Sequence, residues 1–352
     1  MKKLVLILCF LITLLPIYSQ KSNPNANINV KQIGSDYVKI NSPKKLDNTV
    51  LILSTYSDST KQISIKTKNV LSNNEVNFNN LQNINKNQWV ICTGINLPSA
   101  DFVLKGLTPE TDYYLNIYTQ SGNLYALSKI IAFNTVAQIP TKQASQISII
   151  DATDNAMTIK WVNGTGKGRI VVVRKGADVD MPKNGEVYNF SNMYGDIKTK
   201  LGESYVVYDG NDKNINLTIT NLEAGRYFLY VFEYNGDGKY RSYNTEKASN
   251  NPRSKATLLP TPKILSINSL SENSCEIKWE KVNGARTYIL DVATDAGFRN
   301  KVEPYNDLDI GDLSSYEIVD MAQNVKYYIR IKAVGEGTQS NYSKGYEYQM
   351  NK

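Results

Sequence analysis

The amino-acid sequence predicts an all-β protein made of three β-sandwiches in tandem. Two repeated patterns support this prediction. SIIDATDNAMTIKW, which ends at Trp161, aligns with SINSLSENSCEIKW, which ends at Trp279, and each consists of two strand-like segments around a polar turn. A Tyr-rich segment of alternating polarity follows a short polar turn three times, beginning near Leu107, Leu222 and Met321. A period of two is typical of β-strands, and three copies of one plan indicate three domains.

The N-terminal segment MKKLVLILCFLITLLPIYSQ has the features of a secretory signal peptide. Two lysines precede an apolar run from Leu4 to Leu15, and the small residue Ser19 stands directly before Gln20. The run is shorter than the roughly 18 residues that a membrane-spanning helix needs, and no later segment approaches that length. We therefore expect residues 1–19 to be removed, no transmembrane segment, and export to the periplasm, the cell surface or the medium.

Two proline-containing segments separate the predicted domains. They are VAQIPTKQ, around Pro140, and LLPTPK, around Pro260. Proline restricts the conformation of its neighbours and suits short, stiff connectors. The predicted domains are residues 20–137, 138–259 and 260–352. A mature chain of about 330 residues is too long for one small core, which agrees with this division.

The first two domains share a similarity that the third lacks. NQWVICTGINLPSADFVLKGLTPETDYY in the first aligns with ESYVVYDGNDKNINLTITNLEAGRYF in the second. In this alignment Trp89 corresponds to Tyr205, and Leu104 corresponds to Ile219. Both domains also carry extra residues before this point, whereas the third domain is shorter. The first two domains are therefore predicted to be sisters with a long central insertion.

These repeats resemble fibronectin type III domains over nearly all of the mature chain. In that family an early strand contributes a core tryptophan, a place held here by Trp161 and Trp279, whereas the first domain has Ile40 there, in YVKIN. A later strand of the family carries a tyrosine after an L-x-P-x-T-like turn. The resemblance implies that this tyrosine is a core residue whose hydroxyl bonds to nearby backbone, at Tyr113, Tyr227 and Tyr327.

The middle domain contains the glycine-rich stretch WVNGTGKGRIVVVRKG, from Trp161 to Gly176. Phosphate-binding loops open a helix, but the run from Arg169 to Val173 is β-branched and favours a strand. We therefore expect Asn163 to Gly168 to be a hairpin connection whose glycines supply positive φ, and not a nucleotide site. With its long polar loop and EYNGDG end, the domain is similar to a variety common in exported proteins of Bacteroidetes-type bacteria.

Composition excludes several classes of function. The 352 residues contain no histidine, which excludes Ser-His-Asp and Cys-His catalysis and His-ligated zinc. The net charge of +7 is spread without a run of Lys or Arg, so nucleic-acid binding is not expected. Beyond the signal peptide only Cys92 and Cys275 remain, in different predicted domains, and they make no disulfide framework.

Pairs of carboxylates could still support glycoside hydrolysis, and oxygen-rich loops could bind calcium. The candidates are Asp178 with Asp180, Asp209 with Asp212, and the group Asp307, Asp309 and Asp312. All lie in segments rich in Asn and Gly, where Asp favours turns by bonding to its own backbone. The last group also lacks the downstream Glu of an EF-hand loop. We therefore expect no catalytic residue, no metal site and no cofactor.

Loops at the end of a β-sandwich can carry binding residues without cost to the core. The segment EYNGDGKYRSYN follows the Tyr-rich strand of the middle domain. Tyrosine can stack on a sugar or anchor a protein contact, and Arg and Asp add polar specificity. The predicted ligand-binding residues are Asp237, Tyr240, Arg241 and Tyr243.

The sequence thus predicts an exported, non-enzymatic protein of the cell envelope. It would bind a protein or a glycan through sandwich-end loops, as in adhesion, or act as a spacer. Two alternatives stay open. One is a subunit of an outer-membrane or secretion complex with a membrane partner. The other is a carbohydrate-active accessory or catalytic protein that uses the loop carboxylates.

Overall fold

The computed structural model describes residues 27–66, 69–213 and 216–350. The predicted signal peptide lies outside these residues. The prediction of an all-β fold is confirmed, since the described residues form strands, turns and three short 3₁₀ helices, and none of these helices could cross a membrane. The chain divides into two compact units, the first ending at Thr135 and the second beginning at Val136. The 3₁₀ helices are η2 (Phe78–Asn80), η3 (Ile197–Thr199) and η4 (Gly238–Tyr240).

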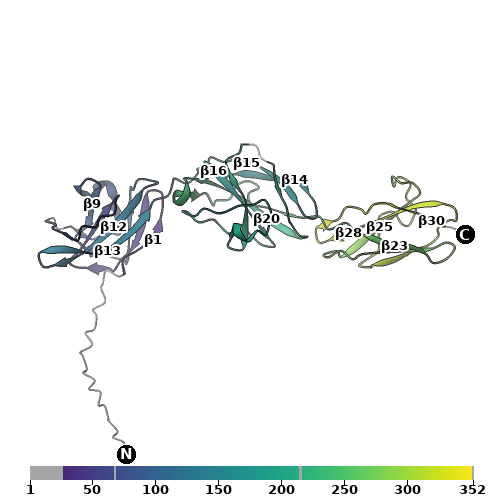
Figure 1. Ribbon diagram of the computed structural model, residues 1–352, viewed down its shortest axis with the longest axis horizontal. Coiled ribbons are helices and arrows are strands. Elements are labelled where there is room, and N and C mark those ends of the chain that lie inside the picture. Colours follow the sequence, from purple (N-terminus) through teal and green to yellow (C-terminus); the bar gives the residue numbers. More distant parts are fainter. Residues whose placement is uncertain (1–26, 67–68, 214–215, 351–352) are drawn as a thin grey trace, which may run out of the picture. The chain divides into compact units, whose positions relative to one another are not determined.

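The first unit contains a four-stranded and a six-stranded sheet around one core, with a small third sheet (Figure 1). The four-stranded sheet has the order β1 (Asn29–Ile33), β2 (Tyr37–Asn41), β11 (Asp101–Lys105) and β7 (Glu75–Asn77). The six-stranded sheet has the order β5 (Gln62–Ile63), β13 (Leu124–Asn134), β12 (Asp112–Ser121), β4 (Thr49–Ser54), β9 (Gln88–Cys92) and β8 (Gln82–Asn85). The small sheet comprises β3 (Lys45–Leu46), β10 (Gly94–Asn96) and β6 (Val70–Leu71).

Alternating burial in the first unit creates its core. Val38 and Ile40 of β2, and Phe102 and Leu104 of β11, are fully buried, while the residues between them are more exposed. These four side chains pack against the inner face of the six-stranded sheet. Ile40, which stands in the place of the family's tryptophan, therefore occupies the same core position with a smaller side chain.

The second unit contains two further pairs of sheets, and the first pair encloses its own core (Figure 1). Its smaller sheet has the order β14 (Ser145–Ala152), β15 (Met157–Val162) and β19 (Leu217–Ile219). Its larger sheet has the order β17 (Lys200–Leu201), β18 (Ser204–Gly210), β16 (Gly168–Lys175), β20 (Arg226–Asn235) and β21 (Ser242–Tyr243), and β22 (Arg253–Ala256) also pairs with β20.

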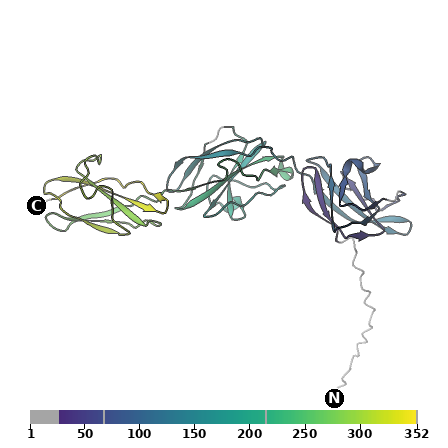
Figure 2. The ribbon, with the colours of Figure 1, turned by 180° about the vertical axis from the view of Figure 1, so that it is seen from behind.

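The second pair of sheets in this unit is built to the same plan around a separate core, and Figure 2 shows it from behind. The smaller sheet has the order β23 (Ile264–Ser269), β24 (Cys275–Trp279) and β27 (Ser315–Ile318). The larger sheet has the order β26 (Leu308–Asp309), β25 (Thr287–Ala293), β28 (Lys326–Gly335) and β29 (Thr338–Gln339), and β30 (Tyr346–Gln349) also pairs with β28. We refer to the pairs of sheets, in chain order, as the first, second and third sandwich. The division into three domains at 137/138 and 259/260 stays a prediction.

The glycine-rich loop differs from its expected form. β15 and β16 lie in different sheets, so residues 163–167 cross from one sheet to the other and do not form a hairpin. None of Gly164, Gly166 and Gly168 has a positive φ. The hairpin prediction was wrong because glycine has a second use, the close approach of other groups to the backbone, which a sequence pattern does not distinguish from a turn.

Each of the first two sandwiches carries an insertion that closes the free edge of its smaller sheet. We define the first insertion as residues 55–87 and the second insertion as residues 176–203, the stretches between equivalent strands of the larger sheets. Within the first insertion β7 pairs in parallel with β11, with Val76 opposite Leu104. Within the second, Met193 forms a parallel bridge with Thr220, directly after β19.

One aromatic residue of each insertion packs at the same place. The Phe78 ring lies 4.7 Å from Trp89 and 6.3 Å from Tyr113, centroid to centroid. The Tyr194 ring lies 4.8 Å from Tyr205 and 5.1 Å from Tyr227. Trp89 and Tyr205 are counterparts in the sequence alignment, and Tyr113 and Tyr227 are counterparts as corner tyrosines. The two insertions therefore share a packing plan, in which the aromatic residue stands eleven positions before Trp89 or Tyr205.

The third sandwich has no such insertion, and a single hydroxyl takes its place. By the sequence alignment Val319 corresponds to Thr220, whose N–H donates to Asn192 and whose carbonyl accepts from Tyr194. In the third sandwich the Val319 N–H donates to the hydroxyl of the buried Tyr305 at 2.8 Å, and that hydroxyl donates to the Val319 carbonyl at 3.2 Å. Tyr305 thus satisfies both backbone groups of this edge position.

We expect Tyr305→Phe to lower the free energy of unfolding of the third sandwich by about 1 kcal/mol, because two backbone groups lose their partner. Trp279 lies in the same core, so its fluorescence reports the transition in urea once Trp89 and Trp161 are replaced by Phe. Tyr316→Phe is the control, since Tyr316 also packs on this core but its hydroxyl has no hydrogen bond among the described residues. An equal loss in both variants would refute the edge role of Tyr305.

Candidate functional site

The glycine-rich loop holds an anion, and that anion is a side chain of the same sandwich. Glu233, on β20, is fully buried. Its Oε1 accepts hydrogen bonds from the Gly164 N–H at 2.9 Å and from Arg169 Nε at 3.1 Å. Its Oε2 accepts from the Gly166 N–H at 2.9 Å and from Arg169 Nη2 at 3.4 Å. The carboxylate is therefore fully bonded in a place without water contact, as a buried charge requires.

Close approach explains the glycines of this loop. A Cβ on Gly164 would collide with the backbone carbonyl of Lys142, and one on Gly166 would lie 2.6 Å from the Glu233 carboxylate. A Cβ on Gly168 would lie 2.5 Å from the ring of Tyr234. Any side chain here would displace the loop amides from the carboxylate. The loop thus has the donors of a phosphate cradle, but Glu233 and Arg169 already occupy it.

The four predicted ligand-binding residues fall into two groups. Asp237 is exposed, with 78% of its side-chain surface accessible, and it pairs with Lys167 at 2.5 Å. Tyr240 is half-buried, with the Lys239 ammonium 5.1 Å from its ring centroid. Arg241 and Tyr243, in contrast, are buried. Only Asp237 and Tyr240 therefore offer surface to a ligand.

Arg241 and Tyr243 belong to an internal cluster. Arg241 Nη1 donates to Asp209 at 2.6 Å, and its guanidinium lies 3.8 Å from the ring centroid of Tyr234. The Tyr234 hydroxyl donates to the other oxygen of Asp209 at 2.7 Å. The Tyr243 hydroxyl donates to the backbone carbonyl of Glu186 at 2.9 Å, and burial raises its pKa to about 12. Sequence proximity placed these residues in a loop, but β21 and its side-chain bonds bury them against the sheet.

The candidate carboxylates are held in local hydrogen bonds. Burial acts to raise the pKa of Asp180, but hydrogen bonds from Ser204 and the Glu203 backbone lower it below its ordinary value. Hydrogen bonds from Lys301 to Asp307, and from Thr287 to Asp309, lower the pKa values of these carboxyls. Asp209 bonds to Tyr234 and Arg241, Asp212 to Tyr208, Asp312 to Lys281, and the Asp178 carbonyl to Arg174.

A glycosidase needs one carboxyl whose pKa is raised, so that it can donate a proton. Among the described residues every carboxyl with a clearly shifted pKa is shifted downward, which makes it a poorer acid catalyst at neutral pH. The carboxyls concerned are Asp58, Asp101, Asp180, Glu223, Asp237, Glu276, Asp291, Asp295, Asp307, Asp309 and Glu347. Within the same residues no group of three acidic or Cys side chains is close enough to bind a metal ion.

The predicted core aromatics occupy the following places. Tyr113, Tyr227 and Tyr327 are buried, and each hydroxyl accepts a hydrogen bond from a backbone N–H of the preceding turn, at 3.0, 2.9 and 2.8 Å. These N–H groups belong to Thr108, Glu223 and Ala322, in the same order. Trp279 is buried against Tyr288, with ring centroids 5.3 Å apart.

Trp161 is only partly buried. Its indole N–H donates to Asn163 at 2.8 Å, and its ring lies 5.7 Å from Tyr208, which in turn lies 6.5 Å from the exposed Phe190. Trp161 therefore lies at the border of the core, next to the second insertion. Cys92 and Cys275 are buried free thiols, as expected for small apolar residues.

The second insertion exposes large apolar side chains, which the polar loop patterns of the sequence did not indicate. Their exposed fractions range from 47% to 70%. Such fractions are unremarkable for single residues, but five within so short a segment are unusual for a soluble surface. The residues are Met181, Val187, Phe190, Met193 and Ile197.

The third sandwich contains a buried ion cluster that sequence patterns did not indicate. Asp291 is fully buried, and its Oδ2 accepts from Arg330 Nε at 2.9 Å and Nη2 at 2.7 Å, while Oδ1 pairs with Lys301 at 2.9 Å. The Arg330 guanidinium lies 4.0 Å from the ring centroids of both Phe298 and Tyr342. Stacking on two rings and two hydrogen bonds to one carboxylate oxygen together fix this arginine.

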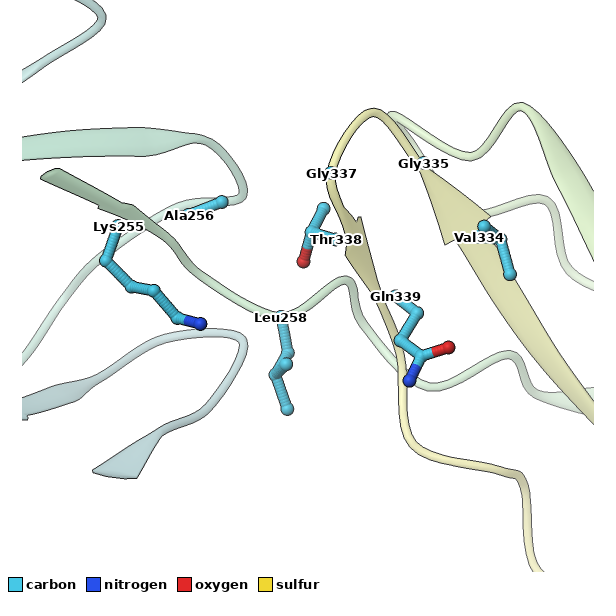
Figure 3. A pocket seen from close by; sticks show the side chains of 8 residues that line it. All are labelled: Lys255, Ala256, Leu258, Val334, Gly335, Gly337, Thr338 and Gln339. Atoms are coloured by element: carbon cyan, nitrogen blue, oxygen red, sulfur yellow. The ribbon is translucent and has the colours of Figure 1, made fainter. Parts of the chain in front are cut away.

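A cavity of about 430 Å³ lies where β22 and the following connector meet the turn between β28 and β29 (Figure 3). Lys255 of β22 and Leu258 of the connector lie on one side of it, and Thr338 and Gln339 of β29 lie on the other. The Thr338 hydroxyl donates to the Thr257 carbonyl at 2.5 Å. Among the described residues, none of the buried polar side-chain atoms that lack a hydrogen-bond partner belongs to a residue that lines this cavity.

Comparison with known proteins gives limited similarity. No family model matches the chain. A curated protein, fibronectin type III domain containing protein 3C1 of Mus musculus, is 24% identical over 247 residues, which cover 66% of this chain and 15% of that protein. The match thus spans only a small part of the relative.

Two solved structures also resemble the chain. The two-domain fibronectin type III segment of chicken tenascin has 12% identity and a TM-score of 0.36, and the match covers 59% of this chain and 99% of that one. The chicken CNTN1 FN1-FN3 domains have 13% identity and a TM-score of 0.26, with coverages of 92% and 97%. In both cases the similarity is to tandem fibronectin type III domains.

We expect Glu233→Ala to destabilise the second sandwich by about 3 to 5 kcal/mol, because Arg169 is left buried without its counter-charge. Unfolding in urea measures this. Added formate should restore part of the loss, since a free carboxylate fits the amides and guanidinium that Glu233 vacates, whereas equal ionic strength from sodium chloride should not. The control is Asp237→Ala, whose exposed pair with Lys167 contributes little. Equal losses for both variants would disprove the role of the cradle.

The third sandwich should lose stability in acid through Asp291. Burial acts to raise the pKa of Asp291, but hydrogen bonds from the Asp307 backbone, Lys301 and Arg330 lower it below its ordinary value. A carboxyl whose pKa is lowered by folding stabilises the folded protein fully at pH values above its unfolded-state pKa of about 3.9. This stabilisation is lost as the pH falls through the pKa of the folded state. We expect Asp291→Asn to flatten the loss of stability below about pH 4, measured by urea unfolding. Asp154→Asn, at an exposed turn, should leave the loss of stability in acid unchanged. If both variants respond to acid in the same way, the role given to Asp291 is wrong.

Proposed function

We propose that this chain is an exported, non-enzymatic protein of three tandem fibronectin type III-like domains, residues 20–137, 138–259 and 260–352. It acts at the cell envelope as a binding or spacer component. The observation that carries this proposal is the set of five exposed apolar side chains on the second insertion. Exposed apolar side chains of this number are a feature of protein contact surfaces.

The second insertion is held in one conformation by bonds to the larger sheet of its sandwich and by the bridge to Thr220 at the edge of the smaller sheet. The Asn184 side chain accepts from the Tyr243 N–H at 2.9 Å, and the Ser191 N–H donates to Val206 at 3.3 Å. The Tyr194 hydroxyl accepts from the Lys175 N–H at 3.1 Å. A surface ordered in advance loses little conformational entropy when a partner binds, which favours affinity. This supports a protein contact and not merely a polar spacer loop.

The loop with Asp237 and Tyr240 supplies a second, smaller contact surface in the proposal. An exposed carboxylate and a partly exposed aromatic ring suit either a glycan or a protein. Arg241 and Tyr243 act behind it, because they bond to Asp209 and Glu186 and so fix the start of β21. Their part in binding is to position the loop.

The partner is tested by co-precipitation with the full chain as bait, from solubilised membranes and from culture supernatant. We expect a protein partner to be retained by the wild type and lost by the double variant Phe190→Ser and Ile197→Ser, because both side chains leave the apolar surface. Leu265→Ser is the matched control, since Leu265 is 60% exposed on the third sandwich.

The source of the partner decides between the hypotheses. Capture from membranes alone would favour a subunit of an outer-membrane or secretion complex, and capture from the supernatant a free exported binder. A glycan array with the wild type and with Asp237→Ala and Tyr240→Ala tests the smaller surface. The proposal is wrong if the double variant keeps every partner of the wild type.

A further inference from the structure

The chain contains four Asn-Gly pairs, at Asn163, Asn184, Asn235 and Asn283. Asparagine is chemically labile, above all before glycine, because the glycine backbone nitrogen can attack the side-chain carbonyl carbon without steric hindrance. The attack needs an asparagine side chain that can turn toward this nitrogen and a glycine N–H that is not held elsewhere. The folded structure therefore determines which of the four pairs can react.

The pair at Asn163 is locked by the anion cradle. The Asn163 side-chain oxygen accepts from the Trp161 indole N–H at 2.8 Å, and its amide nitrogen donates to the Asp212 carbonyl at 3.1 Å. The N–H of the following Gly164 donates to the buried Glu233 carboxylate. Both reacting groups are thus held apart from each other.

Two more pairs are locked by bonds of the second sandwich. The Asn184 side-chain oxygen accepts from the Tyr243 N–H at 2.9 Å, and the N–H of its following glycine donates to the Arg241 carbonyl at 2.7 Å. The Asn235 oxygen accepts from the Lys167 N–H at 2.9 Å, and its amide nitrogen also donates to a backbone carbonyl, at 2.8 Å. The Asn235 side chain is therefore held at both ends.

Asn283 differs from the other three. It is exposed in the turn between β24 and β25, which closes through a hydrogen bond from the Ala285 N–H to the Val282 carbonyl at 3.1 Å. Gly284 has a φ of 86°, which glycine adopts without strain. In the part of the chain that the structure describes, neither the Asn283 side chain nor the Gly284 N–H has a hydrogen-bond partner.

We infer that Asn283 is a site of spontaneous covalent modification by deamidation in the folded protein, and the first of the four to react. The Gly284 nitrogen loses its proton to hydroxide and bonds to Cγ of Asn283, and ammonia leaves, which closes a five-membered succinimide. Water then opens the ring at either carbonyl. The products are aspartate and isoaspartate at position 283, with one water consumed and one ammonia released.

The modified turn contacts packed residues of the second unit. A Cβ placed on Gly284 would lie 3.4 Å from Leu259, which is buried, and a Cβ on Gly335 would lie 2.5 Å from the Gly284 carbonyl oxygen. Isoaspartate lengthens the backbone by one carbon at this turn and adds a negative charge. Deamidation therefore changes the packing of the turn against Leu259 as well as its charge.

In the test, the purified full chain is incubated at mildly alkaline pH, and each of the four pairs is followed by peptide mapping. Deamidation is detected as isoaspartate and as the gain in peptide mass when the side-chain NH2 is replaced by OH. We expect the signal at position 283 severalfold ahead of the other three. In denaturant all four pairs should react at similar rates, since the locking bonds are gone. Equal rates at all four in the native chain, or a native Asn283 that stays intact while the denatured chain reacts, would overturn the inference.

Two variants provide the matched comparison. Asn283→Gln should abolish the early acidic species on isoelectric focusing, because glutamine would need a slower six-membered ring. Asn184→Gln should leave that species unchanged. The inference also fails if the acidic species persists in Asn283→Gln.

Discussion

Each sandwich of this chain must satisfy the backbone groups on the free edge of its smaller sheet. An unpaired edge wastes hydrogen bonds and invites pairing with other chains. The first sandwich solves this with the parallel strand β7, and the second with the bridge between Met193 and Thr220. In the described residues of the third, the hydroxyl of Tyr305 bonds the edge position Val319. The long insertions are therefore part of the fold, whereas in the third sandwich one hydroxyl bonds the single edge position Val319.

The insertions also form a third layer outside the larger sheet. Ile63 and Ile65 pack there on Val50 and Ile52 in the first sandwich, and Val179 and Tyr188 pack on an equivalent cluster in the second. Covering this face leaves other apolar side chains of the second insertion exposed, and these are the side chains proposed above as a contact surface. Buried ion pairs such as that of Glu233 with Arg169 add no large net stability, because desolvation offsets their attraction. We infer that these ion pairs fix the conformation of the loops, because a loop in another position would leave a buried charge without its partner.

The sequence was sufficient to predict the strands, because alternation and the repeated Tyr segments depend on local pattern and burial alone. It failed at the glycine-rich loop, since glycine serves close approach as readily as positive φ, and only the position of Glu233, far along the chain, decides between them. The prediction that Arg241 and Tyr243 are exposed loop residues was also wrong. Their burial depends on bonds to Asp209 and Glu186, which are distant in the sequence and not connected to them by any local pattern. The shared packing of Phe78 and Tyr194 was not predicted, although both stand eleven positions before their aligned partners Trp89 and Tyr205, because one aromatic residue at a fixed spacing is a weak signal on its own.

The absence of histidine has an effect beyond catalysis. Where the pKa of a described side chain is clearly shifted, the shift leads away from neutrality: downward for Asp and Glu, upward for Tyr, Cys, Lys and Arg. No side-chain type with an ordinary pKa near neutrality is present to compensate. The side chains of this protein therefore take up or release few protons around pH 7, and the charge they carry changes little when the surroundings become mildly acidic or alkaline. A partner held by that charge would experience nearly the same surface across those conditions.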